Sequence, residues 1–234
     1  MAVSQFGEPR GVRGWVAARV VARLTGEANR WMVDCLDMEP GDRFLDVGCG
    51  PGLALAAAAE VTGRPAAGVD TSPAMVRLAR RRAGARVLRA DAARLPFADG
   101  SFTRAGSLNS MQFWPAPEQA LAELHRVLRP GGRVAVVLMA RSDEPPGGGR
   151  PAWMADVEAR LRAAGFTGIR VETRSFAGVV HRALLAARPG RESGALLNPT
   201  ADGASEGAGA SIRTTYVTST STDQPTPTTP EVRP

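Results

Sequence analysis

Apolar residues recur along this chain in two spacings: short runs typical of buried strands, and repeats at three and four positions typical of helices. The short runs predict strands over residues 43–47, 66–69, 86–89, 102–108 and 133–139. The helical repeats predict helices over residues 53–61, 73–83 and 117–128. Pro130, Gly131 and Gly132 should end the last of these helices before its strand begins. Strands that alternate with helices in this way predict a mainly parallel sheet covered on both faces, with right-handed crossovers.

The last part of the repeating pattern departs from this alternation. A helix marked by Trp153, Val157 and Leu161 is followed by two predicted strands, residues 169–173 and 179–186. Only residues 174–178 separate these strands, which is too short for a helical crossover, so we expect them to pair antiparallel. The predicted fold is therefore α/β, with a doubly wound, mainly parallel seven-stranded sheet and an antiparallel hairpin at one edge.

The two ends of the chain have patterns of their own. Residues 12–36 show helical spacing, and Val16, Val20 and Leu24 form one apolar stripe, which predicts two short helices and a candidate lid. From residue 189 onward Thr, Ser and Pro replace large apolar residues, and such a segment cannot bury enough surface to offset its ordering entropy. We therefore expect N-terminal helices over 1–38, one α/β domain over 39–188 and a disordered low-complexity tail over 189–234.

Composition narrows the class of protein. No run approaches the roughly 20 apolar residues of a membrane span, and the N-terminus lacks the order of a secretory signal, so we expect a cytoplasmic protein. Cys35 and Cys49 are then expected to be buried thiols, with neither a disulfide nor a metal site. The net charge is +6, but the arginines are scattered among acids without a run of five, which favours a solvated surface over a nucleic-acid partner.

Three glycines at alternate positions, Gly48, Gly50 and Gly52, follow the first predicted strand. Glycine lacks a Cβ atom, so the chain can turn sharply here and bring backbone N–H groups against a ligand. A dinucleotide fingerprint would need a further glycine or alanine where Leu53 stands. Asp46, at the end of the strand, could accept from the ammonium of a bound amino-acid moiety, directly or through water. The alternative is a strand-to-helix turn that merely needs glycine.

Asp70 closes the second predicted strand, twenty residues after Gly50. A carboxylate at this place can accept hydrogen bonds from both hydroxyls of a ribose. NAD enzymes share this requirement, so Asp70 indicates a ribose without identifying the cofactor.

The run from Asp91 to Phe102, DAARLPFADGSF, resembles the DAxxLPFxDxSFD segment of the menaquinone-biosynthesis-like class I S-adenosylmethionine (SAM) methyltransferases. In that family the acid binds the adenine amino group, and the backbone N–H of the next residue contacts the adenine ring. The resemblance implies these roles for Asp91 and Ala92. Arg104 stands near the place where the family usually has a second aspartate.

Residues 124–132 resemble the family's RVLxPGG segment, so the resemblance spans about residues 40–140 and implies a Rossmann-like fold. The cofactor residues it implies are Asp46, Gly48, Gly50, Gly52, Asp70, Thr71, Asp91, Ala92 and Asn109.

Amide and aromatic side chains follow the fourth predicted strand, at the carboxyl edge where open α/β sheets bind ligands. Gln112, Phe113 and Trp114 are therefore the candidate substrate residues, although an aromatic pair here could equally be core packing.

Methyl transfer from a sulfonium needs mainly proximity, alignment and exclusion of water, so a catalytic base is optional. His181, at the start of the last predicted strand, is a weak candidate for an acid or base, and the alternative is an ordinary boundary imidazole. Helix packing accounts for His125.

The expected reaction is methyl transfer from SAM to oxygen or carbon of a small, fairly apolar molecule. A nucleic-acid or protein methyltransferase and a non-catalytic SAM-fold binding protein stay open. Residues 107–114 lack the Asn/Asp-Pro-Pro-aromatic run associated with transfer to a base amino group.

Overall fold

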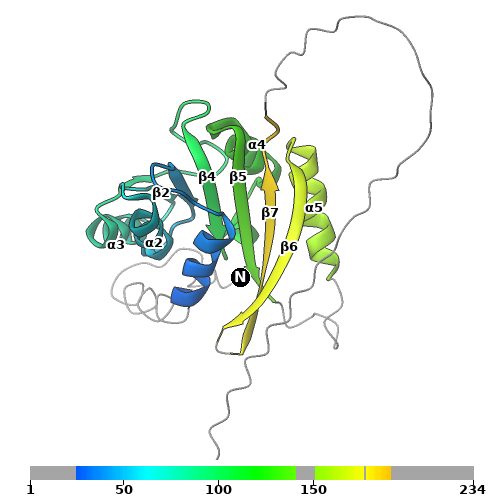
Figure 1. Cartoon of the computed structure of the whole chain (residues 1–234), viewed down its shortest axis with the longest axis horizontal. Helices are drawn as coiled ribbons and strands as arrows, with labels where there is room; N and C mark the ends of the chain where they lie inside the picture. The colour runs from blue at the N-terminus through cyan, green and yellow to red at the C-terminus, as the bar shows by residue number, and fades with distance from the viewer. Residues whose placement is uncertain (1–24, 141–150, 177, 191–234) are drawn as a thin grey trace, which may run out of the picture.

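The computed structural model describes residues 25–140, 151–176 and 178–190, which build a seven-stranded sheet in the order β3-β2-β1-β4-β5-β7-β6 (Figure 1). Strands β1 to β5 pair parallel, whereas β7 pairs antiparallel with both β5 and β6. The predicted parallel sheet with an antiparallel edge hairpin is therefore confirmed. The elements are β1 (Phe44–Val47), α2 (Leu53–Thr62), β2 (Ala67–Asp70), α3 (Pro73–Ala83), β3 (Arg86–Arg89), β4 (Phe102–Leu108), η1 (Met111–Phe113), α4 (Pro117–Val127), β5 (Leu128–Met139), α5 (Ala152–Ala163), β6 (Thr167–Phe176) and β7 (Val179–Ala187).

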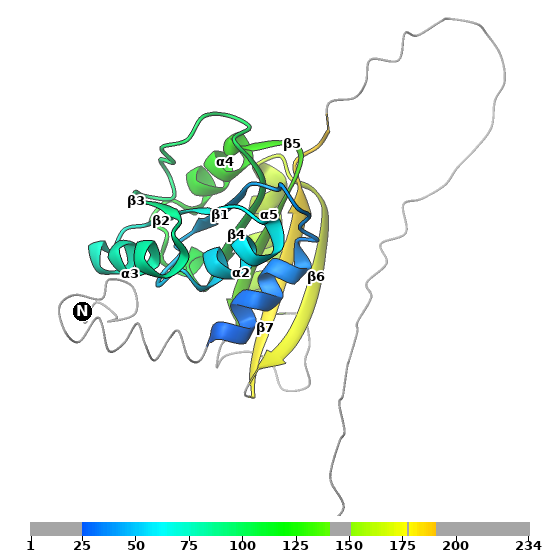
Figure 2. The same cartoon turned by 60° about the vertical axis from the view of Figure 1, so that its left-hand side comes forward.

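Two apolar layers enclose the sheet. Helices α2 and α3, together with a helix over residues 25–35, pack on one face and share one buried cluster (Figure 2). Helices α4 and α5 contribute the second cluster, on the opposite face. Successive side chains of a strand alternate between the two clusters, as Phe44 and Leu45 of β1 do. Both faces are therefore buried, as a doubly wound sheet requires.

The helix over residues 25–35 is built into the core. Ala28, Met32 and Leu36 are at most 1% exposed, and a Cβ on Gly106 of β4 would lie 2.9 Å from the methyl carbon of Met32. The end of this helical segment is tied to the sheet by Arg104, whose Nε donates to the carbonyl of Leu36 over 2.9 Å. The described part of the expected N-terminal helices is thus one layer of the α/β domain. The expected stripe of Val16, Val20 and Leu24, and the tail from residue 191, lie outside the described residues.

Strand β5 begins earlier than the sequence predicts. Leu128 already pairs with Phe102, and the regular pairing resumes at Arg133 after a register shift. Gly131 donates its backbone N–H to the carbonyl of Arg188 over 2.9 Å, and Arg188 donates to the carbonyl of Gly132 over 2.8 Å. Residues 130–132, which we expected to end the helix, therefore form the irregular first part of β5. The local sequence does not reveal this, because their hydrogen-bond partner, Arg188, lies just beyond β7.

The hairpin of β6 and β7 is also longer than predicted, since β6 extends from Thr167 to Phe176. Both cysteines are free and buried, as expected. Among the described helices, none has the length and apolar character needed to cross a membrane.

Candidate functional site

Asp46 is a buried carboxyl group at the carboxyl edge of the sheet. It pairs in register with Gly68 of β2 and Gly106 of β4, and it is 2% exposed. Its Oδ1 atom has no hydrogen-bond partner within the part of the chain that the structure describes. Burial, followed by the nearby charge of Asp70, raises the pKa of Asp46 to about 8. A buried polar atom without a partner costs free energy, and a bound cation at this carboxyl would remove that cost.

The glycine loop uses its backbone N–H groups internally. Gly48 and Cys49 both donate to the carbonyl of Val69, over 2.9 and 3.0 Å. Gly50 donates to Oδ2 of Asp70 over 2.9 Å. We expected these N–H groups to face a ligand, and for these three residues the structure corrects that expectation. The reason is the register of β1 against β2, which places the end of β2 beside the loop.

The three loop glycines are nevertheless required, because Gly48, Gly50 and Gly52 have φ values of +75°, +49° and +82°. A Cβ on Gly52 would lie 2.9 Å from Cα of Ala79 in α3, and one on Gly48 would overlap the side chain of Ser110. A Cβ on Gly50 would meet no protein atom within 4 Å. Two of the glycines therefore allow close packing, whereas the third borders open space in which a ligand has room.

Both carboxyl oxygens of Asp70 accept backbone hydrogen bonds. Oδ1 accepts from the N–H of Ser72 over 2.8 Å, and Oδ2 accepts from Gly50. Burial raises the pKa of Asp70, and these two hydrogen bonds oppose that rise. Thr71, the next residue, is exposed, and its carbonyl accepts from Nε of Arg89 over 3.0 Å. The carboxylate is held in one orientation at the end of β2, as a ribose acceptor would need.

Asp91 and Ala92 open the turn that follows β3. Asp91 is exposed and its Oδ1 accepts from the N–H of Ala93 over 2.9 Å, whereas Ala92 is 6% exposed. The turn is anchored to α4, because Arg126 donates to the carbonyls of Phe97 and Leu95 over 2.8 and 3.1 Å.

Glu123 completes this anchor by accepting from the N–H of Leu95 over 2.8 Å and from Nε of Arg126 over 2.6 Å. Sequence reasoning missed both α4 residues as supports of the turn that follows β3. Their spacing of three positions on one predicted helix was the available signal.

Asn109 connects the ends of β4 and β5. Its φ is +52°, its N–H donates to the carbonyl of Val137 over 2.8 Å, and its Oδ1 accepts from the N–H of Met139 over 2.8 Å. An asparagine tolerates this left-handed conformation better than most residues. The side-chain oxygen of Asn109 thus already accepts a hydrogen bond from the backbone. It lies at the carboxyl edge of the sheet, between the candidate cofactor residues and the candidate substrate residues.

The candidate substrate residues divide into two kinds. Gln112 is exposed and the ring of Phe113 is 47% exposed. Trp114 packs against the apolar cluster beneath α4, and its Nε1 donates to Oγ of Ser110 over 3.0 Å. Phe113 therefore has an exposed apolar side chain that a substrate could contact, whereas Trp114 packs on the core.

His181 lies near the start of β7, opposite Met139 in register, and so at the same edge as the other candidates. It is 1% exposed, and its ring packs edge-on against Phe176 at 5.5 Å. Nδ1 lies 3.1 Å from the carbonyl of Val179, so Nδ1 carries the hydrogen and Nε2 holds a lone pair. Nε2 has no partner among the described residues, and burial lowers the pKa of the ring. His181 is therefore a neutral acceptor. His125 instead packs against Phe166 beneath α4.

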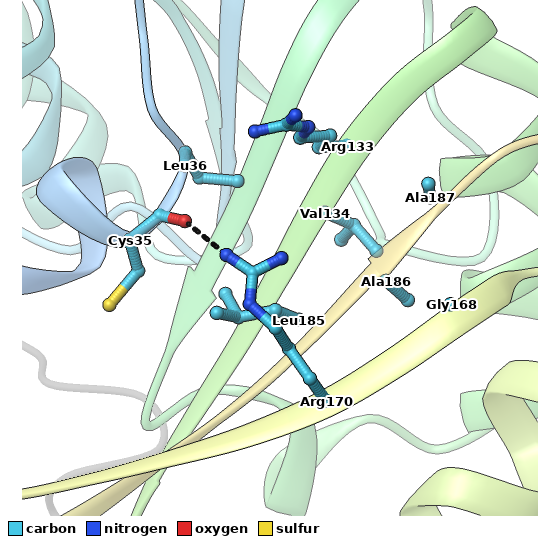
Figure 3. A pocket seen from close by; sticks show the side chains of 9 residues that line it. All are labelled: Cys35, Leu36, Arg133, Val134, Gly168, Arg170, Leu185, Ala186 and Ala187. Carbon is cyan, nitrogen blue, oxygen red and sulfur yellow. Dashed lines mark hydrogen bonds between the residues drawn. The ribbon is translucent and has the colours of Figure 1, made fainter. Parts of the chain in front are cut away.

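A hollow of about 210 Å³ lies between the end of the first helical segment, at Cys35 and Leu36, and strands β5, β6 and β7 (Figure 3). Arg133 and Arg170 line it, and Arg170 donates to the carbonyl of Cys35 over 3.5 Å. Asp37 is 2.8 Å from Arg133 and 3.9 Å from Arg170, so the arginines have a carboxylate partner. This hollow contains none of the predicted site residues.

Comparisons with known proteins find methyltransferases that are similar to this chain. Residues 45–136 match the family described as a methyltransferase domain. The methyltransferase GfsG of Streptomyces halstedii is 41% identical over 43% of this chain and 39% of its own length. The demethylmenaquinone methyltransferase of Thermus thermophilus is 38% identical over 46% of this chain and 53% of its own length. The chain thus spans about half or less of the length of these relatives.

A solved structure of a SAM-dependent methyltransferase from Aquifex aeolicus has the same fold, with a TM-score of 0.60 at 20% identity. The match covers 74% of this chain and 97% of that one.

Proposed function

We propose, from the premise that residues 45–136 belong to the methyltransferase domain family, that this protein transfers a methyl group from SAM to oxygen or carbon of a small, fairly apolar molecule. The observation that carries the proposal is the buried, unpartnered Oδ1 of Asp46 beside a glycine loop that leaves open space at Gly50. SAM supplies an ammonium group that fits this carboxyl and a methyl group already activated on a sulfonium.

Each cofactor candidate has a role that its geometry supports. Asp46 would accept from the ammonium, and Asp70, fixed by Gly50 and Ser72, would accept from the ribose hydroxyls. Asp91 and Ala92 would meet the adenine at the turn anchored by α4. Asn109 would border the methionine end from the edge of β4, although its Oδ1 already accepts from the N–H of Met139.

An apolar acceptor is supported by the exposed side chains at the carboxyl edge. Phe113, Met139 and Val179 are 47%, 42% and 42% exposed. They follow β4, end β5 and begin β7, which are three regions of one sheet edge. Apolar side chains that gather at a ligand-binding edge favour a substrate with apolar surface. The Thermus relative, which is named for methylation of demethylmenaquinone, supports a small-molecule acceptor.

His181 is the candidate acid or base of the proposed reaction. Its Nε2 lone pair would accept the proton of an acceptor hydroxyl, because Nδ1 is already engaged by Val179. A carbon acceptor activated by its own neighbouring groups would not need this residue, so His181→Gln should reduce transfer to oxygen and spare transfer to such a carbon.

The test is incubation of the full chain with methyl-labelled SAM and a whole-cell extract, followed by separation into small-molecule, nucleic-acid and protein fractions. We expect label in the small-molecule fraction, and Asp70→Ala should remove it. Label that enters only RNA, DNA or protein would contradict the proposed substrate class. Tight SAM binding without transfer to any fraction would favour a non-catalytic binding protein.

A further inference from the structure

Seven exposed arginines lie on α3, β3 and the turn that follows. They are Arg77, Arg80, Arg81, Arg82, Arg86, Arg89 and Arg94, called here the arginine surface. From residue 71 to residue 94 the only carboxylate side chain is that of Asp91. The sequence suggested arginines scattered among acids, but this part of the folded chain concentrates one sign of charge.

The fold brings these arginines together. β3 is an edge strand that pairs with β2, and α3 packs beside both strands (Figure 2). Nε of Arg80 on the helix donates to the carbonyl of Val87 on the strand over 2.8 Å. Nε of Arg89 donates to the carbonyl of Thr71, two residues before α3. The arginines of the helix, the edge strand and the turn thus follow the β3 edge of the sheet, with Arg89 near the start of α3, Arg80 near its end and Arg86 turned towards Phe97 on the other face.

The charge of this surface is not balanced by neighbouring acids. Within the part of the chain that the structure describes, none of the seven arginines forms an ion pair, in contrast to Arg104, Arg126 and Arg133, which do. Three of them, Arg80, Arg81 and Arg82, also sit in the last turn of α3, where the helix dipole favours cations. The surface therefore concentrates exposed guanidinium groups that have no carboxylate partner among the described residues, although Arg80 and Arg89 each donate one backbone hydrogen bond and Arg86 lies over the ring of Phe97.

The absence of apolar side chains indicates the kind of partner. The exposed large apolar residues of the described chain are Val61, Phe113, Met139 and Val179, and none belongs to α3, β3 or the turn. A protein interface usually has an aromatic or apolar centre, and a membrane-bound surface gains affinity by inserting apolar side chains. A phosphate backbone needs neither, since planar guanidinium groups bind phosphates in a bidentate manner.

From this charge complementarity we infer that the arginine surface binds the phosphate backbone of a nucleic acid. The surface lies at the β3 edge, on the adenine side of the proposed cofactor site, whereas the substrate candidates lie beyond β4. The nucleic acid is thus a docking partner and not the methyl acceptor. The inference stands independently of the proposed reaction.

The test is fluorescence anisotropy of the full chain with a short labelled DNA duplex of mixed sequence over a series of salt concentrations. The variant R77Q/R81Q/R82Q removes three charges from the arginine surface. The variant R30Q/R64Q/R162Q removes three exposed charges elsewhere and is the matched control. All six side chains are exposed, so both variants should melt like the parent protein.

We expect the parent protein to bind the duplex with an affinity that falls steeply with salt. R77Q/R81Q/R82Q should weaken binding about tenfold or more and lower the steepness of the log–log salt dependence by about 2 to 3, because each lost phosphate contact contributes about 0.9. The control variant R30Q/R64Q/R162Q should change the affinity and the salt dependence far less. Equal losses in the two variants would show that net charge alone binds the duplex and would overturn the inference. Binding to anionic vesicles or polyglutamate that depends on the three arginines, without such dependence for the duplex, would overturn it as well.

Discussion

The backbone N–H of Gly50 donates to the carboxylate of Asp70 over 2.9 Å, so a side chain of β2 adds to the backbone hydrogen bonds that join the glycine loop to the end of that strand. Asp70 therefore has two tasks in the proposed site, since it orients the loop and presents a carboxylate to the ribose. The loop does not meet the ligand through the N–H groups of residues 48–50, which β2 already engages.

Asp70→Ala should weaken binding of S-adenosylhomocysteine tenfold to a hundredfold, or about 1.5–3 kcal/mol, through loss of charged hydrogen bonds. Calorimetric titration measures this directly. Glu60→Ala, which removes a largely exposed carboxylate from α2, is the control and should leave the affinity unchanged. An unchanged affinity for Asp70→Ala would show that the ribose binds elsewhere.

Alanine at Gly50 and at Gly52 should act in different ways. Gly52→Ala forces a Cβ against Cα of Ala79 and should destabilise the fold by about 2–4 kcal/mol. Gly50→Ala meets no protein atom, so its stability cost should be about 1–2 kcal/mol from the left-handed backbone. Its Cβ would instead occupy ligand space and abolish cofactor binding. Chemical denaturation and calorimetry separate the two effects, and full ligand binding by Gly50→Ala would contradict this placement of the cofactor.

The buried Asp46 should make stability depend on pH. Its pKa is raised from 3.8 to about 8 by folding, so its favourable contribution is present below about pH 4 and is lost as the pH rises towards 8. Asp46→Asn removes this titration. The unfolding free energy of the parent protein should therefore fall more between pH 5 and pH 8 than that of Asp46→Asn. Parallel pH profiles for the two proteins would argue that Asp46 ionises normally in the folded state.

Arg188 should mark the end of the segment that the fold requires. Its Nη1 atom donates to the carbonyls of His125, Arg126 and Leu128, and its backbone pairs with the start of β5. A chain cut after Gly190 should keep the unfolding free energy of the full chain within about 0.5 kcal/mol, whereas Arg188→Ala should lose about 1.5–3 kcal/mol. A large loss on truncation would instead show that residues beyond Gly190 pack on the domain.

The sequence predicted the order of strands and helices well, because each element carries its own apolar period and a clear stop. The glycine loop, and the acids within β1, at the end of β2 and after β3, were also located, since motif spacing determines where they fall. The start of β5 was predicted wrongly at Arg133, because the partner of Gly131 and Gly132 is Arg188, far away in the chain.

Other features depend on side-by-side packing that a linear pattern does not contain. The direction of the loop N–H groups follows from the register between β1 and β2. The free lone pair of His181 follows from its contact with the carbonyl of Val179. The arginine surface was missed because its members never form a long run, and only the packing of α3 beside the edge strand brings Arg80 next to β3.

We propose that the carboxyl edge of this sheet holds SAM and not a dinucleotide. Calorimetric titration of the full chain with S-adenosylhomocysteine and, separately, with NAD distinguishes the two ligands. Because Leu53 replaces the third small residue of a dinucleotide loop and Asp91 stands in the turn where we propose that adenine binds, we expect micromolar binding of S-adenosylhomocysteine and none of NAD. Tight binding of NAD without a response to S-adenosylhomocysteine would contradict the account.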